Sequence, residues 1–325
     1  MAVHTAITEG EARTVLAEYD TLGLLGIEGV AGGSVNSNFA LVTQGGRIFL
    51  RVYEEQGRTG AEHETALLER LATAGVPTPP PIRRRDRGLV SSVRGKPAAL
   101  FPWRAGTMRC QASVTAADAR RVGRALACVH VAGQAEAPYT GRFEFSDLQR
   151  RLDRIDAEGG PDWTSVVPSL RTALADAHAS RHAGLPRGLV HGDLFRDQVL
   201  WRADGEIAAL LDFESACDGT FAFDLMVTVL AWCFGDRFDA NLARSMAEGY
   251  QSERALSAAE RDGLAAEGRF AALRFAITRI TDFSLRARSA DGTVRPITRD
   301  WRRFMARFEE LGTLGADGLR HVLGV

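Results

Sequence analysis

Apolar stretches alternate with glycine-containing turns between residues 27 and 51, and this pattern predicts β-strands. Apolar stretches at 39–43 and 48–53 lie on either side of the Gly45-Gly46 pair, which is typical of a tight turn between antiparallel strands. The segment before them, residues 32–38, is a loop of small residues. The pattern therefore predicts a small-residue loop followed by a β-hairpin.

Helical periodicity is expected before and after this hairpin. Residues 9–19 are expected to form a short helix, and apolar residues recur at helical spacing within 61–74. Gly75 is typical of the residue that ends a helix, and the proline-rich segment 77–81 prevents the helix from continuing. A helix followed by an extended segment is the predicted result.

Two more strands are expected at 89–93 and 97–103, joined by a tight turn at Arg94-Gly95-Lys96. The segment Arg104-Ala105-Gly106 then interrupts the pattern. We therefore place a domain boundary after residue 105, which gives a first domain of residues 1–105 and a second of residues 106–325.

The second domain is predicted to be mainly helical. Thr115, with Asp118 three positions later, is typical of a capping box at the start of a helix. The exception is 188–213, where short apolar stretches lie on either side of a turn at 203–205 and predict a β-hairpin. A further helix with one apolar and one polar face is expected over 263–288.

Composition and charge restrict the function classes. The 325 residues include 40 basic and 41 acidic side chains, so the chain lacks the broad positive charge of a dedicated nucleic-acid binder. The longest apolar run, 225–234, is half of the about 20 residues that a membrane-spanning helix needs. Without a recognisable signal segment or paired cysteines, we expect a cytoplasmic protein with reduced thiols that contacts neither nucleic acid nor membrane.

Acidic residues gather around the predicted hairpin of the second domain. Asp193 precedes the first strand, and Asp212 follows the second, so a hairpin would bring both carboxylates to the same end. With the amide of Gln198 they offer the oxygen ligands that Mg²⁺ prefers, and a nucleotide polyphosphate would complete its coordination. For any one of these residues, a surface turn is the alternative explanation.

Phosphoryl transfer also needs groups that hold the phosphates. Backbone N–H groups of the loop around Gly33, Ser34 and Asn36 are candidates, although the same loop is also typical of an ordinary hairpin turn. The only basic residue inside the strand at 48–53 is Arg51, and Glu64 on the following helix is its expected partner.

The segment His191-Gly-Asp-Leu-Phe-Arg-Asp-Gln-Val-Leu200, followed by Leu211-Asp-Phe213, resembles the catalytic loop and metal-binding aspartate of the aminoglycoside phosphotransferase-like kinases. The resemblance implies an α+β, protein-kinase-like fold with two lobes, a small antiparallel-sheet N-lobe for the nucleotide and a mainly helical C-lobe. It makes Asp193 the catalytic residue, Asp212 a metal ligand and His191 a structural residue. Its hinge corresponds to 98–106 and implies that Phe101 and Trp103 contact adenine.

Within that family, the chain is most similar to the bacterial homoserine kinases. Four stretches carry this resemblance: 95–99, 185–195, 216–234 and 271–283. The resemblance implies an enzyme that uses ATP and Mg²⁺ and phosphorylates the hydroxyl of a small molecule, with L-homoserine the favoured substrate. We expect a monomer or homodimer. Two positions depart from the pattern: Gln198 replaces an asparagine, and Arg51 stands where many relatives have lysine.

An amino acid with a hydroxyl group needs a base, an acidic group and an arginine in its pocket. Asp193 is the base, and Glu214, Asp218 and Asp224 are candidates for the ammonium group. Arg274, on the polar face of the helix at 263–288, is the candidate for the carboxylate; a solvated helix face is the alternative.

Two other functions stay open at this point. The acceptor of the phosphoryl group could be another amino alcohol, a sugar or an aminoglycoside. The departures at Gln198 and Arg51 would also suit a catalytically silent nucleotide-binding protein.

Overall fold

The computed structural model describes residues 4–30, 35–133, 141, 143–285 and 299–325. The chain forms two compact units: Met1–Met108 with Val199–Glu214, and Arg109–Gln198 with Ser215–Val325. The first unit ends three residues beyond the predicted boundary at 105 and takes in Val199–Glu214, which we expected in the second domain.

Backbone hydrogen bonds explain why Val199–Glu214 belongs to the first unit. Thr107 and Trp201 exchange two backbone bonds of 2.9 Å, and the Leu210 amide donates to the carbonyl of Pro77 at 2.6 Å. The predicted hairpin forms within this segment, as β7 (Val199–Trp201) pairs with β8 (Ile207–Leu210). The hairpin is thus tied to the segments before and after the main sheet.

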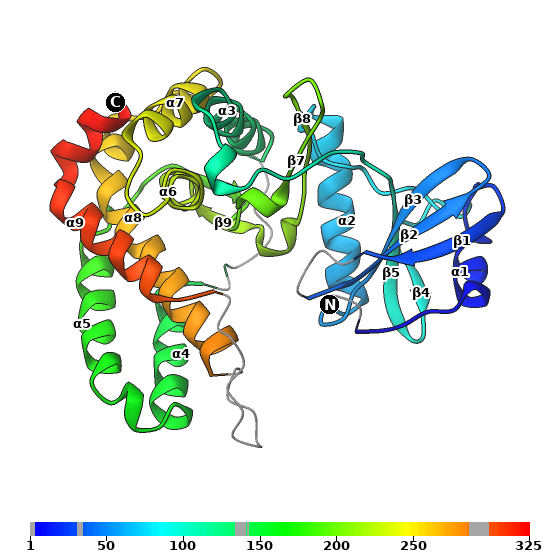
Figure 1. Ribbon diagram of the computed structural model, residues 1–325, viewed down its shortest axis with the longest axis horizontal. Helices are drawn as coiled ribbons and strands as arrows, with labels where there is room; N and C mark the ends of the chain where they lie inside the picture. The colour runs from blue at the N-terminus through cyan, green and yellow to red at the C-terminus, as the bar shows by residue number, and fades with distance from the viewer. Residues whose placement is uncertain (1–3, 31–34, 134–140, 142, 286–298) are drawn as a thin grey trace. The chain divides into compact units, whose positions relative to one another are not determined.

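The first unit contains one five-stranded antiparallel sheet of strand order β1-β2-β3-β5-β4 (Figure 1). Its strands are β1 (Leu24–Gly29), β2 (Ser37–Thr43), β3 (Gly46–Val52), β4 (Ser91–Val93) and β5 (Lys96–Pro102). The predicted turn between β2 and β3 is present, and Gly46 there has a φ of +111°, which favours glycine.

Two helices accompany this sheet. Helix α1 (Glu9–Leu16) packs Ala12, Val15 and Leu16 into a core with inward side chains of all five strands. Helix α2 (Arg58–Thr73) packs near β5 and ends before Gly75, whose φ of +87° agrees with the predicted stop. The sheet fixes the position of its strand β3, and α2 fixes the position of Glu64.

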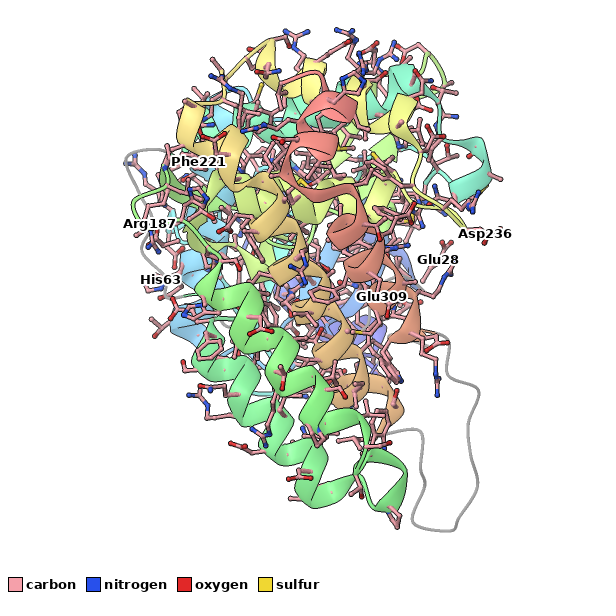
Figure 2. The ribbon with its side chains drawn as sticks, turned by 90° about the vertical axis from the view of Figure 1, so that its left-hand side faces the viewer. Glu28, His63, Arg187, Phe221, Asp236 and Glu309 are labelled. Carbon is pink, nitrogen blue, oxygen red and sulfur yellow. The ribbon has the colours of Figure 1, made fainter. Side chains whose placement is uncertain are left out.

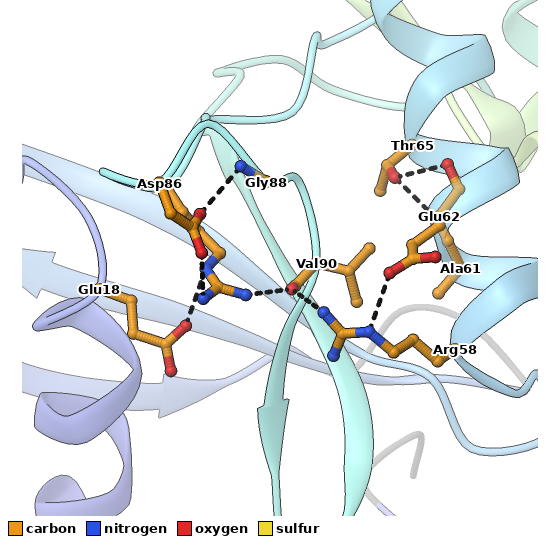
Figure 3. A network of polar contacts seen from close by, with 9 residues as sticks. Glu18, Arg58, Ala61, Glu62, Thr65, Asp86, Gly88 and Val90 are labelled. Carbon is orange, nitrogen blue, oxygen red and sulfur yellow. Dashed lines mark hydrogen bonds and ion pairs between the residues drawn. The ribbon is translucent and has the colours of Figure 1, made fainter.

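A polar network anchors the start of α2 (Figure 3). Arg58 and Arg84 both donate to the carbonyl oxygen of Val90, at 3.0 and 2.8 Å. Arg58 also pairs with Glu62 at 2.8 Å, and Arg84 with Glu18 at 3.0 Å. Because Val90 precedes β4, these bonds connect α2 to the far edge of the sheet.

The second unit is mainly helical, as predicted. Its helices are α3 (Ala116–Ala132), α4 (Phe145–Glu158), α5 (Val166–Ala179), α6 (Phe221–Trp232), α7 (Ala240–Gln251), α8 (Ala258–Arg279) and α9 (Arg302–Leu323). A short antiparallel pair, β6 (Arg187–Val190) with β9 (Cys217–Thr220), accompanies them.

Helix α3 begins with the predicted capping box and crosses α7 closely. Thr115 accepts from the Asp118 amide at 3.1 Å, and the Asp118 carboxylate accepts from the Thr115 amide at 3.0 Å. A Cβ at Gly123 would lie 2.1 Å from the Met246 carbonyl oxygen, and one at Gly249 would lie 1.9 Å from that of Arg120. Glycine is therefore required at both positions for the two backbones to touch.

Helices α8 and α9 pack along each other, and α4 packs beside α5 (Figure 2). The regular part of α8 ends at Arg279, earlier than the predicted 288, because the chain continues as one π-helical turn, Ile280–Ser284. Within the described part of the chain, no helix combines the length and apolar character needed to cross a membrane.

Candidate active site

A cavity of about 220 Å³ lies within the first unit. Its walls are mostly apolar and include Phe49, Leu68, Phe101, Trp103 and Leu210. An apolar pocket with a few charged groups is typical of a site for a planar, polar ligand. The structure therefore places both predicted adenine contacts, Phe101 and Trp103, on the wall of one pocket.

Arg51 lines the same cavity and forms the expected ion pair with Glu64, at 2.9 Å between Nη1 and Oε1. Burial acts to lower the pKa of Arg51, but the nearby carboxylates of Glu64 and Asp212 outweigh it and raise that pKa. Burial raises the pKa of Glu64, while Arg51 acts against this effect. Arg51 is thus a fixed, permanently charged cation on the cavity wall.

Asp212, another lining residue of the cavity, combines two unusual features. Its φ of +62° lies in the left-handed region, which side chains other than glycine rarely occupy. Its Oδ1 is buried and has no hydrogen-bond partner among the residues that the structure describes. A buried oxygen without a partner costs about 1–3 kcal/mol, so it is usually retained for a ligand. A carboxylate oxygen of this kind fits a hard cation such as Mg²⁺.

The loop predicted to hold phosphates is described only in part. Gly33 and Ser34 lie outside the described residues. Asn36 is buried, and its amide donates to Glu214 at 2.8 Å while its oxygen accepts from the Glu54 amide N–H at 3.2 Å. Glu214, a candidate for the substrate ammonium group, therefore forms a hydrogen bond with the end of this loop in the first unit.

The predicted catalytic loop, residues 191–198, lies in the second unit and follows β6 directly. Gly192 has a φ of +74°, and a Cβ there would lie 2.9 Å from the Ser215 carbonyl oxygen. The backbone N–H groups of His191 and Gly192 donate to the two oxygens of Asp224, at 2.7 and 2.8 Å. One carboxylate on α6 therefore fixes the backbone at the start of this loop.

Asp224 is fully buried, and this corrects our assignment of it to the substrate. Besides the two backbone bonds, it contacts His130 Nε2 at 3.0 Å. Burial acts to raise the pKa of Asp224, but the bonds from His130 and the loop lower it. With its lone pairs used within the protein and no exposed surface, Asp224 is a structural anchor of the loop. An ammonium group has no access to it.

His130 and Tyr250 complete this buried network, and sequence reasoning missed both as partners of the loop. His130 Nδ1 lies 2.8 Å from the Tyr250 hydroxyl, which also accepts from Arg254 at 3.1 Å. Burial lowers the pKa of His130, so its neutral form donates from Nε2 to Asp224 and accepts from Tyr250. A buried histidine on a helix otherwise rich in alanine was the available signal.

Asp193 is partly exposed, with its carboxylate 3.4 Å from Nη1 of Arg274. Arg274 is only 3% exposed, and its guanidinium lies 3.8 Å from the ring centres of Phe143 and of Phe275. The expected acceptor-binding arginine is therefore packed between aromatic rings and directed at the predicted catalytic carboxylate.

Two more candidates have clear positions. Gln198 ends a short 3₁₀ turn after Asp193, and its side-chain amide makes no hydrogen bond to another residue of the described chain. Asp218 on β9 forms an ion pair with Arg187 on β6, at 2.5 Å. Gln198 is thus available to a ligand, whereas Asp218 serves the small strand pair.

Comparison with known proteins agrees with this chemistry. Residues 26–259 match the model of the phosphotransferase enzyme family. The chain is similar to a homoserine kinase of Caulobacter sp. (strain K31), at 37% identity over 91% of this chain and 92% of that protein. It is also similar to a homoserine kinase of Rhizobium johnstonii, at 36% identity over 87% and 88% of the two chains.

Among solved structures, the chain is similar to a microcompartment-associated aminopropanol kinase, with a TM-score of 0.68 and 22% identity. The match covers 96% of this chain and 99% of that one. A likeness at this identity concerns the fold, and it confirms the kinase-like α+β fold that the catalytic-loop residues implied.

Proposed function

The chain belongs to the phosphotransferase enzyme family, and we propose that it is a kinase that transfers the γ-phosphoryl group of ATP to the hydroxyl of L-homoserine. The observation that carries the substrate is the 35–37% identity to homoserine kinases over most of the chain. The cavity with Arg51 and Asp212 supports the nucleotide part of the proposal, because it combines apolar walls with two charged side chains.

In the proposed mechanism, Phe101 and Trp103 hold the adenine base, and Arg51 contacts the phosphates. Glu64 fixes the direction of the Arg51 side chain, so that no conformational freedom is lost when the nucleotide binds. Arginine presents a planar fork of donors and therefore contacts phosphate oxygens at a different reach from lysine.

Asp212 and Gln198 would hold Mg²⁺. When bound, Mg²⁺ neutralises the charge that develops on the phosphate oxygens during transfer. The Asp212 oxygen without a protein partner is the group that supports this assignment most strongly, and the Gln198 amide offers a second, neutral oxygen.

Asp193 would orient the acceptor hydroxyl and accept its proton. As the hydroxyl oxygen forms its bond to the γ-phosphorus, the bond from phosphorus to the leaving oxygen of ADP breaks, and the proton passes to the carboxylate. Arg274 fixes the position of the Asp193 carboxylate, because Nη1 of Arg274 lies 3.4 Å from it. We therefore assign Arg274 to Asp193 as a positioning residue.

A coupled assay of ADP release with Mg-ATP tests the proposal, with L-homoserine, choline, methylthioribose, simple sugars and aminoglycosides as acceptors. Saturable turnover is expected with L-homoserine. Asp193→Asn keeps the shape of the side chain but removes the proton acceptor, so kcat is expected to fall by about 100-fold or more. Its thermal unfolding is the control for a folded variant.

Each other result would point to one of the open alternatives. Turnover with a different acceptor alone would retain the kinase and reject homoserine. ATP binding by calorimetry without turnover of any acceptor would indicate a catalytically silent protein. A kcat for Asp193→Asn within a few-fold of the parent would contradict the role of Asp193.

A further inference from the structure

Arginines gather where the catalytic loop, the end of α8 and the start of α9 contribute side chains to the second unit. The group consists of Arg196 on the loop, Arg279 on α8, and Arg303 and Arg307 on α9. The guanidinium groups of Arg279 and Arg307 both lie 4.4 Å from the ring centre of Phe304, and the charge of Arg303 acts on the other three arginines. Burial, and then the charges of neighbouring arginines, lower the pKa of Arg279 to about 10 and that of Arg307 to about 9. Positive charges held together in this way favour a bound anion.

Two of these arginines already have partners that use their charge. Arg196 donates to the carbonyl oxygen of Ala231, and Arg307 donates to that of Leu230 at 2.7 Å. Both carbonyls lie in the last turn of α6, where the helix carries partial negative charge. Arg196 and Arg307 therefore support the end of α6.

The other two have donors to spare. Arg279 makes one bond of 3.0 Å to the Asp300 carbonyl oxygen, and its guanidinium lies 4.4 Å from the ring centre of Phe304. Arg303 is exposed and forms no hydrogen bond or ion pair with another residue that the structure describes. Arg279 and Arg303 are thus the cations that an incoming anion would meet.

The carboxylates nearby offset the charge of this pair only in part: Asp193 and Asp300 act to raise the pKa of Arg279, but burial and the arginines around it lower that pKa. Asp193 faces Arg274, as described above. Asp197 pairs with Arg299 at 3.5 Å, and the carboxylate of Asp300 pairs with Arg302 at 3.4 Å. Each of these acids has an arginine of its own, so a positive excess remains at Arg279 and Arg303.

Packed aromatic rings connect Arg279 to the catalytic loop. The ring centre of Phe195, two residues after Asp193, lies 4.9 Å from the ring centre of Phe275. Phe275 in turn stacks on Phe304, and their ring centres are also 4.9 Å apart. Arg274 lies over Phe275, and Arg279 lies over Phe304. The guanidinium that holds Asp193 and the guanidinium with free donors therefore lie over adjacent, stacked rings.

We propose that Arg279 and Arg303 bind the carboxylate of the amino-acid acceptor. The proposal rests on the proposed function and replaces Arg274, which our sequence interpretation assigned to this group. In an extended homoserine the hydroxyl oxygen and the carboxylate carbon are about 5 Å apart, four bonds of about 1.5 Å each. Asp193 lies near enough to Arg279 for its charge to act on the pKa of that group, so one small molecule can place its hydroxyl at Asp193 and its carboxylate at Arg279.

The test compares L-homoserine with 3-aminopropan-1-ol, which is the same molecule without the carboxylate. Arg303→Gln is the first variant, because this side chain is exposed and its loss leaves the fold intact. Arg279→Gln is the second, with thermal unfolding as the check on folding. Arg124→Gln is the matched control, since Arg124 is an exposed arginine on α3 whose partner is Glu253, at 2.6 Å, and not an acid of this group.

Both variants are expected to lower kcat/KM for L-homoserine by about 10-fold to 100-fold, mainly through KM, because one charge-assisted bond is lost. For 3-aminopropan-1-ol the same variants are expected to stay within about twofold of the parent, and Arg124→Gln should change neither value. Calorimetric Kd values for the two acceptors give the same comparison without turnover.

Equal losses with both acceptors, or no loss with either, would overturn the proposal. A loss specific to L-homoserine in Arg274→Gln, with Arg279→Gln and Arg303→Gln unchanged, would return the carboxylate to Arg274. A parent enzyme that neither binds nor phosphorylates L-homoserine would instead reject the proposed function itself, so the two failures are distinguishable.

Discussion

Asp212 in the first unit and Asp224 in the second are both aspartates of the predicted site, yet their surroundings are opposite. Asp212 lines a cavity and keeps a buried oxygen without a partner among the described residues. Asp224 is fully buried, and bonds to two backbone amides and one imidazole use its oxygens. An incompletely bonded carboxylate indicates a ligand site, whereas a fully bonded one indicates a structural role.

The same contrast extends to two nitrogen-bearing side chains, Arg51 and His130. Arg51 is held by Glu64 on one side, while its Nε is buried without a partner in the described structure. His130 has partners at both ring nitrogens. The first unit therefore retains bonding capacity for a ligand, and the second uses its capacity to make the loop around Asp193 rigid.

The largest expected effect is on catalysis and comes from Asp212→Asn. If Asp212 holds the metal, kcat should fall by about 100-fold to 1,000-fold, and the Mg²⁺ concentration for half-maximal rate should rise. Stability should change little, because Asp212 repels Glu64 but attracts Arg51, and the two effects oppose each other. Steady-state kinetics over a Mg²⁺ series and thermal unfolding measure both quantities. A destabilised variant with the parent's kcat would reverse the comparison.

In contrast to Asp212→Asn, the variant Asp224→Asn should lower the stability of the protein. The amide keeps one acceptor oxygen, but its NH₂ group faces the backbone donor of either His191 or Gly192, so the free energy of unfolding should fall by about 3 kcal/mol. Urea denaturation measures this loss. The matched control is Asp218→Asn, since Asp218 forms a partly exposed pair with Arg187 and its loss should cost less than about 1 kcal/mol.

At a temperature where Asp224→Asn is still folded, its Mg²⁺ dependence should equal that of the parent. A selective change in the KM for the acceptor, without loss of stability, would mean that Asp224 does contact substrate after all.

These two aspartates also show what the sequence could predict. The spacing from His191 to Asp212 was sufficient for the loop, the hairpin and the family, because these features are local in the chain. The role of Asp224 depends on His130, 94 residues earlier, and on burial by several helices. Periodicity gives no information on which of several neighbouring carboxylates becomes buried, so Asp224 was grouped with Glu214 as a ligand.

The end of α8 was missed for a similar reason. The apolar pattern over 263–288 continues past Arg279, but the backbone widens into a π-helical turn at Ile280–Ser284. Such a turn is set by packing on neighbouring elements, and sequence propensity gives no signal for it. The arginine group next to this turn could therefore not be predicted from the sequence, because it forms only where the fold brings α8, α9 and the loop together.

The buried network should make stability depend on pH. Because burial lowers the pKa of His130 in the folded state, the unfolded chain binds a proton more readily below its ordinary pKa of about 6.5. The free energy of unfolding should therefore fall between pH 7 and pH 5, by up to about 2 kcal/mol from this group. The lowered pKa of Asp224 adds a further loss only below about pH 4.

Urea denaturation at pH 5, 6 and 7 measures the effect, and His130→Gln should flatten the profile. His178 is the matched control, because it lies on α5 outside the network and its replacement by glutamine should leave the slope unchanged. An identical slope in the parent and in His130→Gln would show that other groups cause the acid sensitivity.

The smallest expected effect concerns Gln198, which stands where the family has an asparagine. It extends the comparison between side chains with and without protein partners. Its amide has no protein partner in the described structure, so Gln198→Ala should leave the stability within about 0.5 kcal/mol of the parent. If the amide oxygen contacts the metal, the Mg²⁺ requirement should rise about three-fold to ten-fold. Gln198→Asn shortens the side chain by one methylene and tests reach separately from chemistry: an Mg²⁺ requirement equal to that of Gln198→Ala would show that the longer side chain is needed. No change in either variant would remove Gln198 from the metal site and leave Asp212 as the supported ligand.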